Sequence, residues 1–124
     1  EGHHTVSHHQ LNPHNIHQYT RINTHHVSLF KKFVDRLANT QDGDGTLLDH
    51  SILLYGTGMG DGDHHTPYNL PVVLIGGGRG TLEGGRHLSY PMHTPFMNLG
   101  LSLLDKVGVE VASISDSTGR LSDL

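Results

Sequence analysis

Cysteine is absent from the 124 residues, which excludes disulfide scaffolds, thiolate zinc sites and cysteine nucleophiles together. Charge is also scarce: eight Lys and Arg stand against twelve Asp and Glu, giving a net charge of −4 and a pI near 6.3. This balance argues against a nucleic-acid-binding face. No apolar run approaches the roughly 20 residues that a membrane helix needs. We therefore expect neither nucleic acid nor a membrane among the partners.

Several catalytic and binding signatures are missing as well. The chain has no G-x-x-x-x-G-K or G-x-G-x-x-G phosphate loop and no G-x-S-x-G nucleophile elbow. The segment 42–45 (Asp-Gly-Asp-Gly) resembles the start of a calcium loop. An EF-hand, however, needs glycine where Leu47 stands and glutamate where Leu53 stands. We interpret 42–45 as a solvated turn, with calcium bound by some of these aspartates as the alternative.

Histidine, by contrast, is abundant, with thirteen in the chain and eight of them in the first 26 residues. Imidazole and carboxylate groups bind zinc and similar ions, and their sites often combine a close pair with a distant residue. Three clusters qualify. They are His3, His4, His8 and His9 around Ser7, then Asp61, Asp63, His64 and His65, and finally His87 and His93.

Apolar patterning predicts an α/β fold in one domain over residues 1–124, with two helices and a small partial sheet of few strands. The opening residues are polar and show no helical periodicity. Asn12-Pro13 is a helix start, and apolar residues at helical spacing then predict a helix over about 13–38. The domain divides into a histidine-rich segment (1–12), this helix, a strand–loop–strand metal region (46–93), and a C-terminal helix and tail (94–124).

Two apolar runs, 52–55 and 70–75, are continuous rather than alternating, which favours strands of a covered, parallel sheet. Residues 39–45 and 79–91 are expected to be loops, and the tail 109–124 a short strand with polar turns. The second histidine cluster directly follows the first predicted strand. Open α/β sheets place their sites at such strand ends, and the alternating glycines there allow sharp turns.

Individual candidate residues have competing interpretations. His26 lies on the apolar stripe of the predicted helix, where a hydrogen-bonded core histidine is the more common case and a metal ligand the alternative. Ser7 stands beside several histidines and is a candidate nucleophile. Arg86 is a candidate for bidentate binding of an anionic substrate through its guanidinium group. The simpler interpretation is a solvated arginine.

The stretch His4-Thr5-Val6-Ser7-His8-His9 carries a specific signature. It resembles a bacterial family of unknown function named for its H-x-x-S-H-H motif. Four further stretches are similar to the same family, so that the resemblance extends over essentially the whole chain. They are residues 46–51, 70–78, 84–88 and 116–121. Family members are typically exported and longer. The chain resembles their C-terminal portion and shows no signal peptide, so the resemblance implies a periplasmic or extracellular location.

That family is in turn distantly similar to the alkaline phosphatases and sulfatases, in which a strand ends in an Asp-His pair that binds a catalytic metal. The corresponding positions here are Asp63 with His64 or His65. The resemblance implies a partial version of that fold and two-metal ester hydrolysis. It also implies that the nucleophile and the first metal-binding aspartate belong to an N-terminal part without counterpart in these 124 residues.

The leading hypothesis is therefore a metal-dependent hydrolase that cleaves an ester-like bond of a small-molecule substrate with metal-activated water. The bond is a phosphate or sulfate ester, a carboxylic ester or a lactone. The metal is zinc, with calcium or manganese as alternatives. The expected metal ligands are His4, His8, His9, Asp63 and His65, and the expected bases or substrate contacts are His64, Asp61 and His87.

Two alternatives remain. One is a histidine-rich metal-binding module, or an inactive fragment of a larger hydrolase; the other is a polar surface of histidines without a ligand. Two strands and two helices make a thin core at this length, so a homo-oligomer is also expected.

Overall fold

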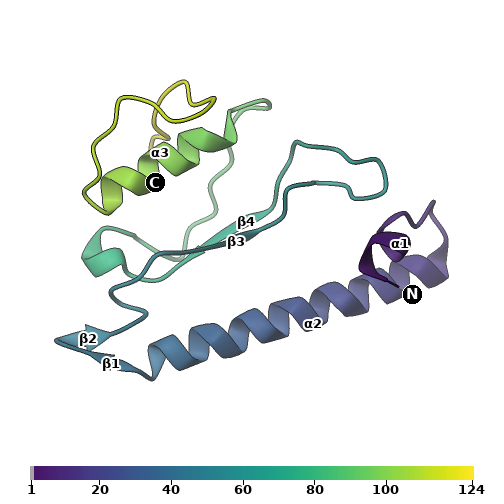
Figure 1. Ribbon diagram of the computed structural model, residues 1–124, viewed down its shortest axis with the longest axis horizontal. Helices are drawn as coiled ribbons and strands as arrows, with labels where there is room; N and C mark the ends of the chain where they lie inside the picture. The colour runs from purple at the N-terminus through teal and green to yellow at the C-terminus, as the bar shows by residue number, and fades with distance from the viewer. Residues whose placement is uncertain (1) are drawn as a thin grey trace.

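A computed structural model describes residues 2–124 and places in them three α-helices, a short 3₁₀ helix and two two-stranded antiparallel sheets. The mixed α/β class is thus confirmed. In Figure 1, α2 runs along one side of the β3–β4 sheet and α3 lies on the other side. The elements are α1 (His3–Ser7), α2 (Pro13–Ala38), β1 (Gln41–Asp42), β2 (Gly45–Thr46), β3 (Leu53–Gly56), β4 (Val72–Ile75), η1 (Gly78–Gly80) and α3 (Phe96–Lys106).

The long helix predicted over 13–38 is confirmed, including its start. The Asn12 side chain accepts hydrogen bonds from the backbone N–H groups of His14 and Asn15, at 2.9 and 3.4 Å. Pro13 occupies the first helical turn, where its missing N–H costs no hydrogen bond. The predicted C-terminal helix is confirmed as α3.

Residues 3–7 form the helix α1, which the lack of periodicity had argued against. A helix this short is decided by packing rather than by sequence pattern. Val6 and Ser7 are buried where α1 packs on the first turns of α2, as Figure 1 shows. Tertiary contact therefore overrides the weak local preference.

The expectation of a covered, parallel sheet is wrong. The strands β3 and β4 pair antiparallel, with Leu53 opposite Ile75 and Tyr55 opposite Val73. The reason is the connection: residues 57–71 contain no helix, and parallel neighbours need a crossover that is usually helical. The sheet is not covered either, because Leu54 and Val73 remain 47% and 49% exposed.

The loop expected at 39–45 instead contains the small β1–β2 hairpin, which turns at Gly43 with φ +59°. The two aspartates that resemble a calcium loop both contact the half-buried His50. His50 Nδ1 lies 2.8 Å from Asp42 Oδ2, and its Nε2 lies 3.1 Å from Asp44 Oδ1. The 42–45 turn is therefore tied down by histidine rather than simply solvated.

The C-terminal tail, which the structure describes in full, has turns and no strand, contrary to expectation. Its ordering comes from side chains. The Arg120 guanidinium pairs with the Asp105 carboxylate of α3 and donates to the Val111 carbonyl, and Thr118 N–H donates to Asn98 Oδ1 at 2.8 Å. Local propensity was thus a poor guide to a segment held by long-range polar contacts.

The apolar core is small. Among residues 2–124, Val6 and Leu101 are the buried apolar residues, each 1% exposed. Along α2, all of which the structure describes, no residue is buried, and its expected apolar stripe is covered only in part, for example where Phe30 stacks on Tyr55 with ring centroids 4.3 Å apart. His26 on this stripe is exposed, so the interpretation as a core histidine is wrong. None of the helices in residues 2–124 is long and apolar enough to cross a membrane.

Candidate metal centre

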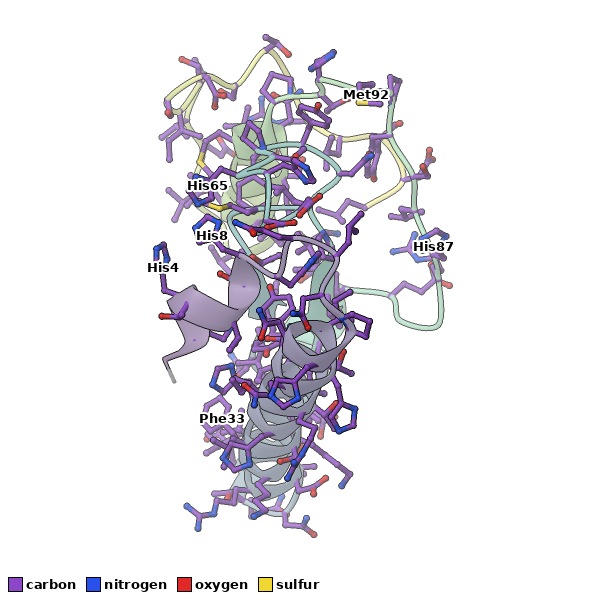
Figure 2. All side chains as sticks on the ribbon, turned by 90° about the vertical axis from the view of Figure 1, so that its right-hand side faces the viewer. His4, His8, Phe33, His65, His87 and Met92 are labelled. Atoms are coloured by element: carbon purple, nitrogen blue, oxygen red, sulfur yellow. The ribbon has the colours of Figure 1, made fainter. Side chains whose placement is uncertain are left out.

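Two histidine clusters that are far apart in the sequence meet in space. The long β3–β4 connection reaches the end of α2 where α1 lies (Figure 1). There His65 Nε2 stands 3.1 Å from His8 Nε2, and the two ring centroids are 4.7 Å apart. The His4 ring lies 4.8 Å from the His8 ring. Figure 2 shows these three labelled side chains in one group at the same edge of the molecule.

The turn that carries His65 is built by hydrogen bonds to Asp61. Asp61 Oδ1 accepts from the Asp63 N–H at 2.8 Å, and the Asp61 carbonyl accepts from the Thr66 N–H at 2.9 Å. His65 has a left-handed backbone with φ +52°. Gly62 packs on Ser7 of α1: a Cβ at this glycine would lie 3.4 Å from Ser7 Cβ. This is an ordinary van der Waals distance, so the turn lies directly against α1.

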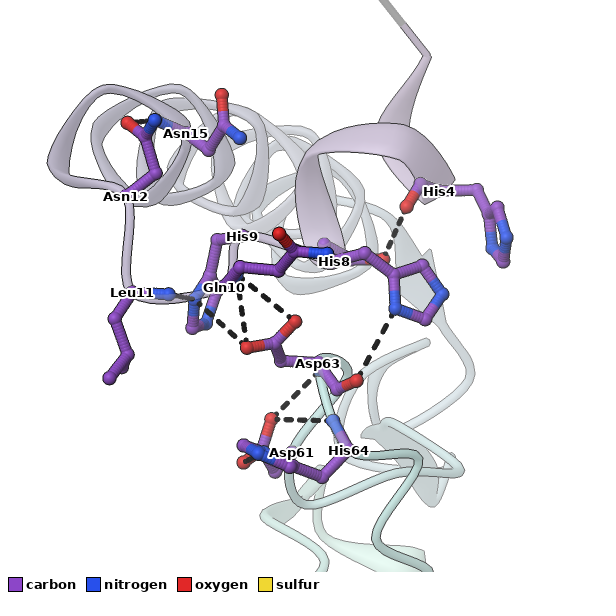
Figure 3. A network of polar contacts seen from close by, with 11 residues as sticks. His4, His8, His9, Gln10, Leu11, Asn12, Asn15, Asp61, Asp63 and His64 are labelled. Atoms are coloured by element: carbon purple, nitrogen blue, oxygen red, sulfur yellow. Dashed lines mark hydrogen bonds and ion pairs between the residues drawn. The ribbon is translucent and has the colours of Figure 1, made fainter.

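Asp63 joins this turn to the segment after α1 (Figure 3). Its carboxylate, only 7% exposed, accepts from the Gln10 N–H at 3.1 and 3.2 Å. Its backbone carbonyl accepts from His8 Nδ1 at 3.3 Å. The carboxylate that was expected to be a metal ligand is thus turned toward the backbone at Gln10, and Asp63 acts here as a positioning residue.

The Asp63 carbonyl also selects the tautomer of neutral His8. A carbonyl oxygen only accepts hydrogen bonds, so His8 Nδ1 is the donor, and in the neutral ring Nε2 carries the lone pair. That lone pair faces His65 Nε2. Metal-binding histidines commonly show this arrangement, with one ring nitrogen donating to a carbonyl and the other facing the ion.

His9 is arranged differently from His8. The Leu11 N–H donates to His9 Nδ1 at 3.1 Å, so the lone pair of that nitrogen is already engaged. Asp63 Oδ2 lies 3.4 Å from the same nitrogen. Figure 3 shows the His8 and His9 rings on opposite sides of Asp63. His9 therefore helps to hold the loop and does not join the His8–His65 pair.

Asp61 and His64 form a second polar pair on the same turn. His64 Nδ1 donates to Asp61 Oδ2 at 2.8 Å, and the His64 ring is otherwise largely exposed. The hydrogen bond from His64 lowers the pKa of Asp61 below its ordinary 3.8, and the same bond raises the pKa of His64 above its ordinary 6.5. The bond orients the His64 ring and leaves its Nε2 exposed.

Three other predicted site residues lie elsewhere or are engaged. The Ser7 hydroxyl donates to the His4 carbonyl at 2.8 Å inside α1, and Ser7 is buried. The Arg86 guanidinium donates to the carbonyls of Glu83 and Asp123, so it ties its loop to the C-terminal tail. His87 lies on the far side of the molecule from His8 and His65 in Figure 2. The structure therefore brings together His4, His8 and His65 but not His87 or Arg86.

Some contacts at the site were not anticipated. His3 Nε2 contacts Asn23 Oδ1 at 3.3 Å, and its ring lies 5.2 Å from that of Tyr19. These contacts hold α1 against α2. No local sequence feature indicates these contacts, because His3 and Asn23 are 20 residues apart in the chain. Elsewhere, a hollow of ≈ 500 Å³ borders Arg120, whose guanidinium is paired with Asp105.

Within residues 2–124, no three His, Asp or Glu side chains are already arranged to hold a metal ion. Comparison with known proteins adds nothing to this geometry: no family model, curated protein or solved structure matches the chain. Support for a metal site at His4, His8 and His65 therefore comes from the geometry of these residues alone.

The Asp61–His64 pair makes a pH-dependent prediction. Because the pKa of His64 is raised, its contribution to stability is complete below pH 6.5 and is lost as the pH rises through the folded-state pKa. Because the pKa of Asp61 is lowered, its contribution is complete above pH 3.8 and is lost in more acidic solution. A proton NMR titration should show His64 titrating above 6.5, and Asp61→Asn should move that pKa back toward 6.5. An unchanged His64 titration in the variant would refute the pairing.

Proposed function

We propose that the chain binds a divalent metal ion through His8 and His65, with His4 as a third ligand. The observation that carries the proposal is the 3.1 Å approach of the two Nε2 atoms. Two nitrogen ligands of a tetrahedral zinc ion, each about 2.05 Å from the metal, stand about 3.3 Å apart. The His8–His65 pair is close to this spacing before any ion is added.

His4 can complete the ligand set by a side-chain rotation. It is exposed, and exposed side chains change rotamer on the picosecond to nanosecond timescale. Its ring already lies 4.8 Å from that of His8 and 6.5 Å from that of His65. Three imidazole ligands without thiolate favour zinc, whereas calcium and manganese prefer oxygen ligands. The nearest carboxylate, that of Asp63, is engaged by the backbone at Gln10, which also favours zinc.

Zinc binding can be measured by isothermal titration calorimetry and by mass spectrometry of the metal content. We expect one ion per chain, and none at this site in the double variant His8→Ala/His65→Ala. Zinc at about 100 times its dissociation constant should raise the free energy of unfolding by about 2.7 kcal/mol in the wild type only, since ligand bound to the folded state stabilises it.

The matched control is His14→Ala/His17→Ala, which removes two exposed histidines of α2, of which His14 contacts Gln18 of the same helix. It should bind zinc as the wild type does. Equal loss of zinc from both double variants would mean that histidine content, not the His8–His65 geometry, holds the ion. No zinc uptake by the wild type would refute the site.

A second proposal, hydrolysis of an ester-like bond, is favoured by the Asp61–His64 pair beside His65. Bound zinc supplies a Lewis acid and lowers the pKa of a coordinated water. His64 Nε2 takes a proton from the attacking water while Asp61 holds the ring through Nδ1. The carbonyl, phosphoryl or sulfuryl centre gains the water oxygen, and the bond to the alcohol oxygen breaks as that oxygen takes the proton from His64 Nε2, which returns His64 to its neutral state.

The substrate classes stay as expected from the sequence: phosphate and sulfate esters, carboxylic esters and lactones. The resemblance to the H-x-x-S-H-H family, and more distantly to alkaline phosphatases and sulfatases, supports a hydrolytic role and an exported location. Ser7 is a poor nucleophile for this role, because its hydroxyl proton is engaged by the His4 carbonyl and the residue is buried. Water is therefore the attacking group in this proposal.

Hydrolysis is tested with a panel of chromogenic phosphate, sulfate and carboxylic esters and a lactone, in the presence of zinc. We expect turnover above that of free zinc, a fall of about 100-fold in kcat for His64→Gln, and no change for His17→Gln on the exposed face of α2. Zinc bound at His8 and His65 without such turnover would identify the chain as a non-catalytic metal-binding module instead.

A further inference from the structure

The chain exposes much more surface than a folded monomer of its mass. Its accessible surface is 8573 Å² at 13.6 kDa. The scaling of surface with mass for folded monomers gives about 6,600 Å². The excess of about 2,000 Å² is more than the roughly 800 Å² that each partner buries in a standard protein interface.

Much of the exposed apolar surface lies on α2 and on the β3–β4 sheet. Leu29 and Phe33 are four residues apart on one side of α2, and each is about half exposed, at 47% and 49%. Phe33 lies on the flank of the helix in Figure 2. Leu54 and Val73 are equally exposed, on opposite faces of the sheet, because Leu54 is paired with Leu74 and Val73 with Tyr55. Tyr55 stacks on Phe30 of the same chain's α2, so the face that carries Leu54 is the one this helix leaves open. An isolated two-stranded sheet is marginally stable, and its open edges invite further pairing or cover.

We propose that a second copy of this chain covers this surface. In the resulting symmetric dimer, the Leu29–Phe33 flank of each α2 packs on the Leu54 face of the β3–β4 sheet of the other copy, as helices cover sheets in layered α/β folds. Burial of the excess would remove about 4,000 Å² in total, which lies in the range of obligate homodimers. This proposal is independent of metal binding.

Charge disfavours the partner's α2 helix as the docking surface and favours the rest of the partner chain. The helix α2 carries four basic residues and one acidic residue, a net of +3. The rest of the chain has four basic and eleven acidic residues, a net of −7. Two α2 helices side by side would repel each other, whereas α2 against the acidic body of the partner is attracted to it.

The experiment uses analytical ultracentrifugation together with cross-linking. The wild type should sediment as a dimer that weakens with added salt, and Phe33→Glu should raise the dimer dissociation constant about 100-fold, because it buries a charge at the contact. The matched control Val107→Glu, at a residue of which 61% is exposed at the end of α3, should not. Circular dichroism of both variants checks that the fold persists.

Because the chain has no cysteine, single introduced cysteines report the arrangement directly. A short bismaleimide should join Phe33→Cys chains to Leu54→Cys chains in a mixture, and should not join Phe33→Cys chains to one another. A monomeric wild type at all concentrations would overturn the proposal and leave a different protein as the occupant. A dimer cross-linked through Phe33 on both copies would overturn the docking on the sheet.

Discussion

The contact of Asp63 with residues 8–10 is the constraint on which the candidate site depends. The side-chain carboxylate of Asp63 accepts a hydrogen bond from the Gln10 N–H, and its backbone carbonyl accepts one from His8 Nδ1. These hydrogen bonds join the β3–β4 connection to the end of α1. Nothing in the local sequence of either segment indicates that the two lie side by side. The same hydrogen bonds also leave the His8 lone pair facing His65. A single aspartate thereby sets both the position of His8 and its tautomer in the neutral ring.

The rest of the molecule gives this contact little apolar support. Val6 and Leu101 are the buried apolar residues among residues 2–124, and they lie in different helices, α1 and α3. Polar contacts and turns therefore hold much of the tertiary structure together. His50 lies between the carboxylates of Asp42 and Asp44, and Arg86 donates to the Asp123 carbonyl in the C-terminal tail. The proposed ion and the proposed second copy of the chain would each add stabilisation that a core this small does not supply.

The sequence predicted the parts of the fold that local physics decides. Asn12-Pro13 predicted the start of α2, because helix capping depends on residues that are adjacent in the sequence. The two apolar runs predicted the positions of β3 and β4. Other features depend on contacts between residues far apart in the chain, and sequence spacing does not encode such contacts. These features are the direction of the strands, the helix α1 and the roles of Asp63 and His9. The sequence placed His8 and His65 in one expected ligand set, and the structure brings them together. The sequence did not predict that His87 would lie on the other side of the molecule or that Arg86 would bind the C-terminal tail.

The most direct test of the account is a long-range proton–nitrogen NMR spectrum of the histidine rings, recorded without metal and after zinc is added. The account predicts that His8 carries its proton on Nδ1 in the metal-free protein, as the Asp63 carbonyl requires. On addition of zinc, the Nε2 resonances of His8 and His65 should shift together while that of His17 stays in place. A His8 ring protonated on Nε2, or a zinc response confined to other histidines, would contradict it.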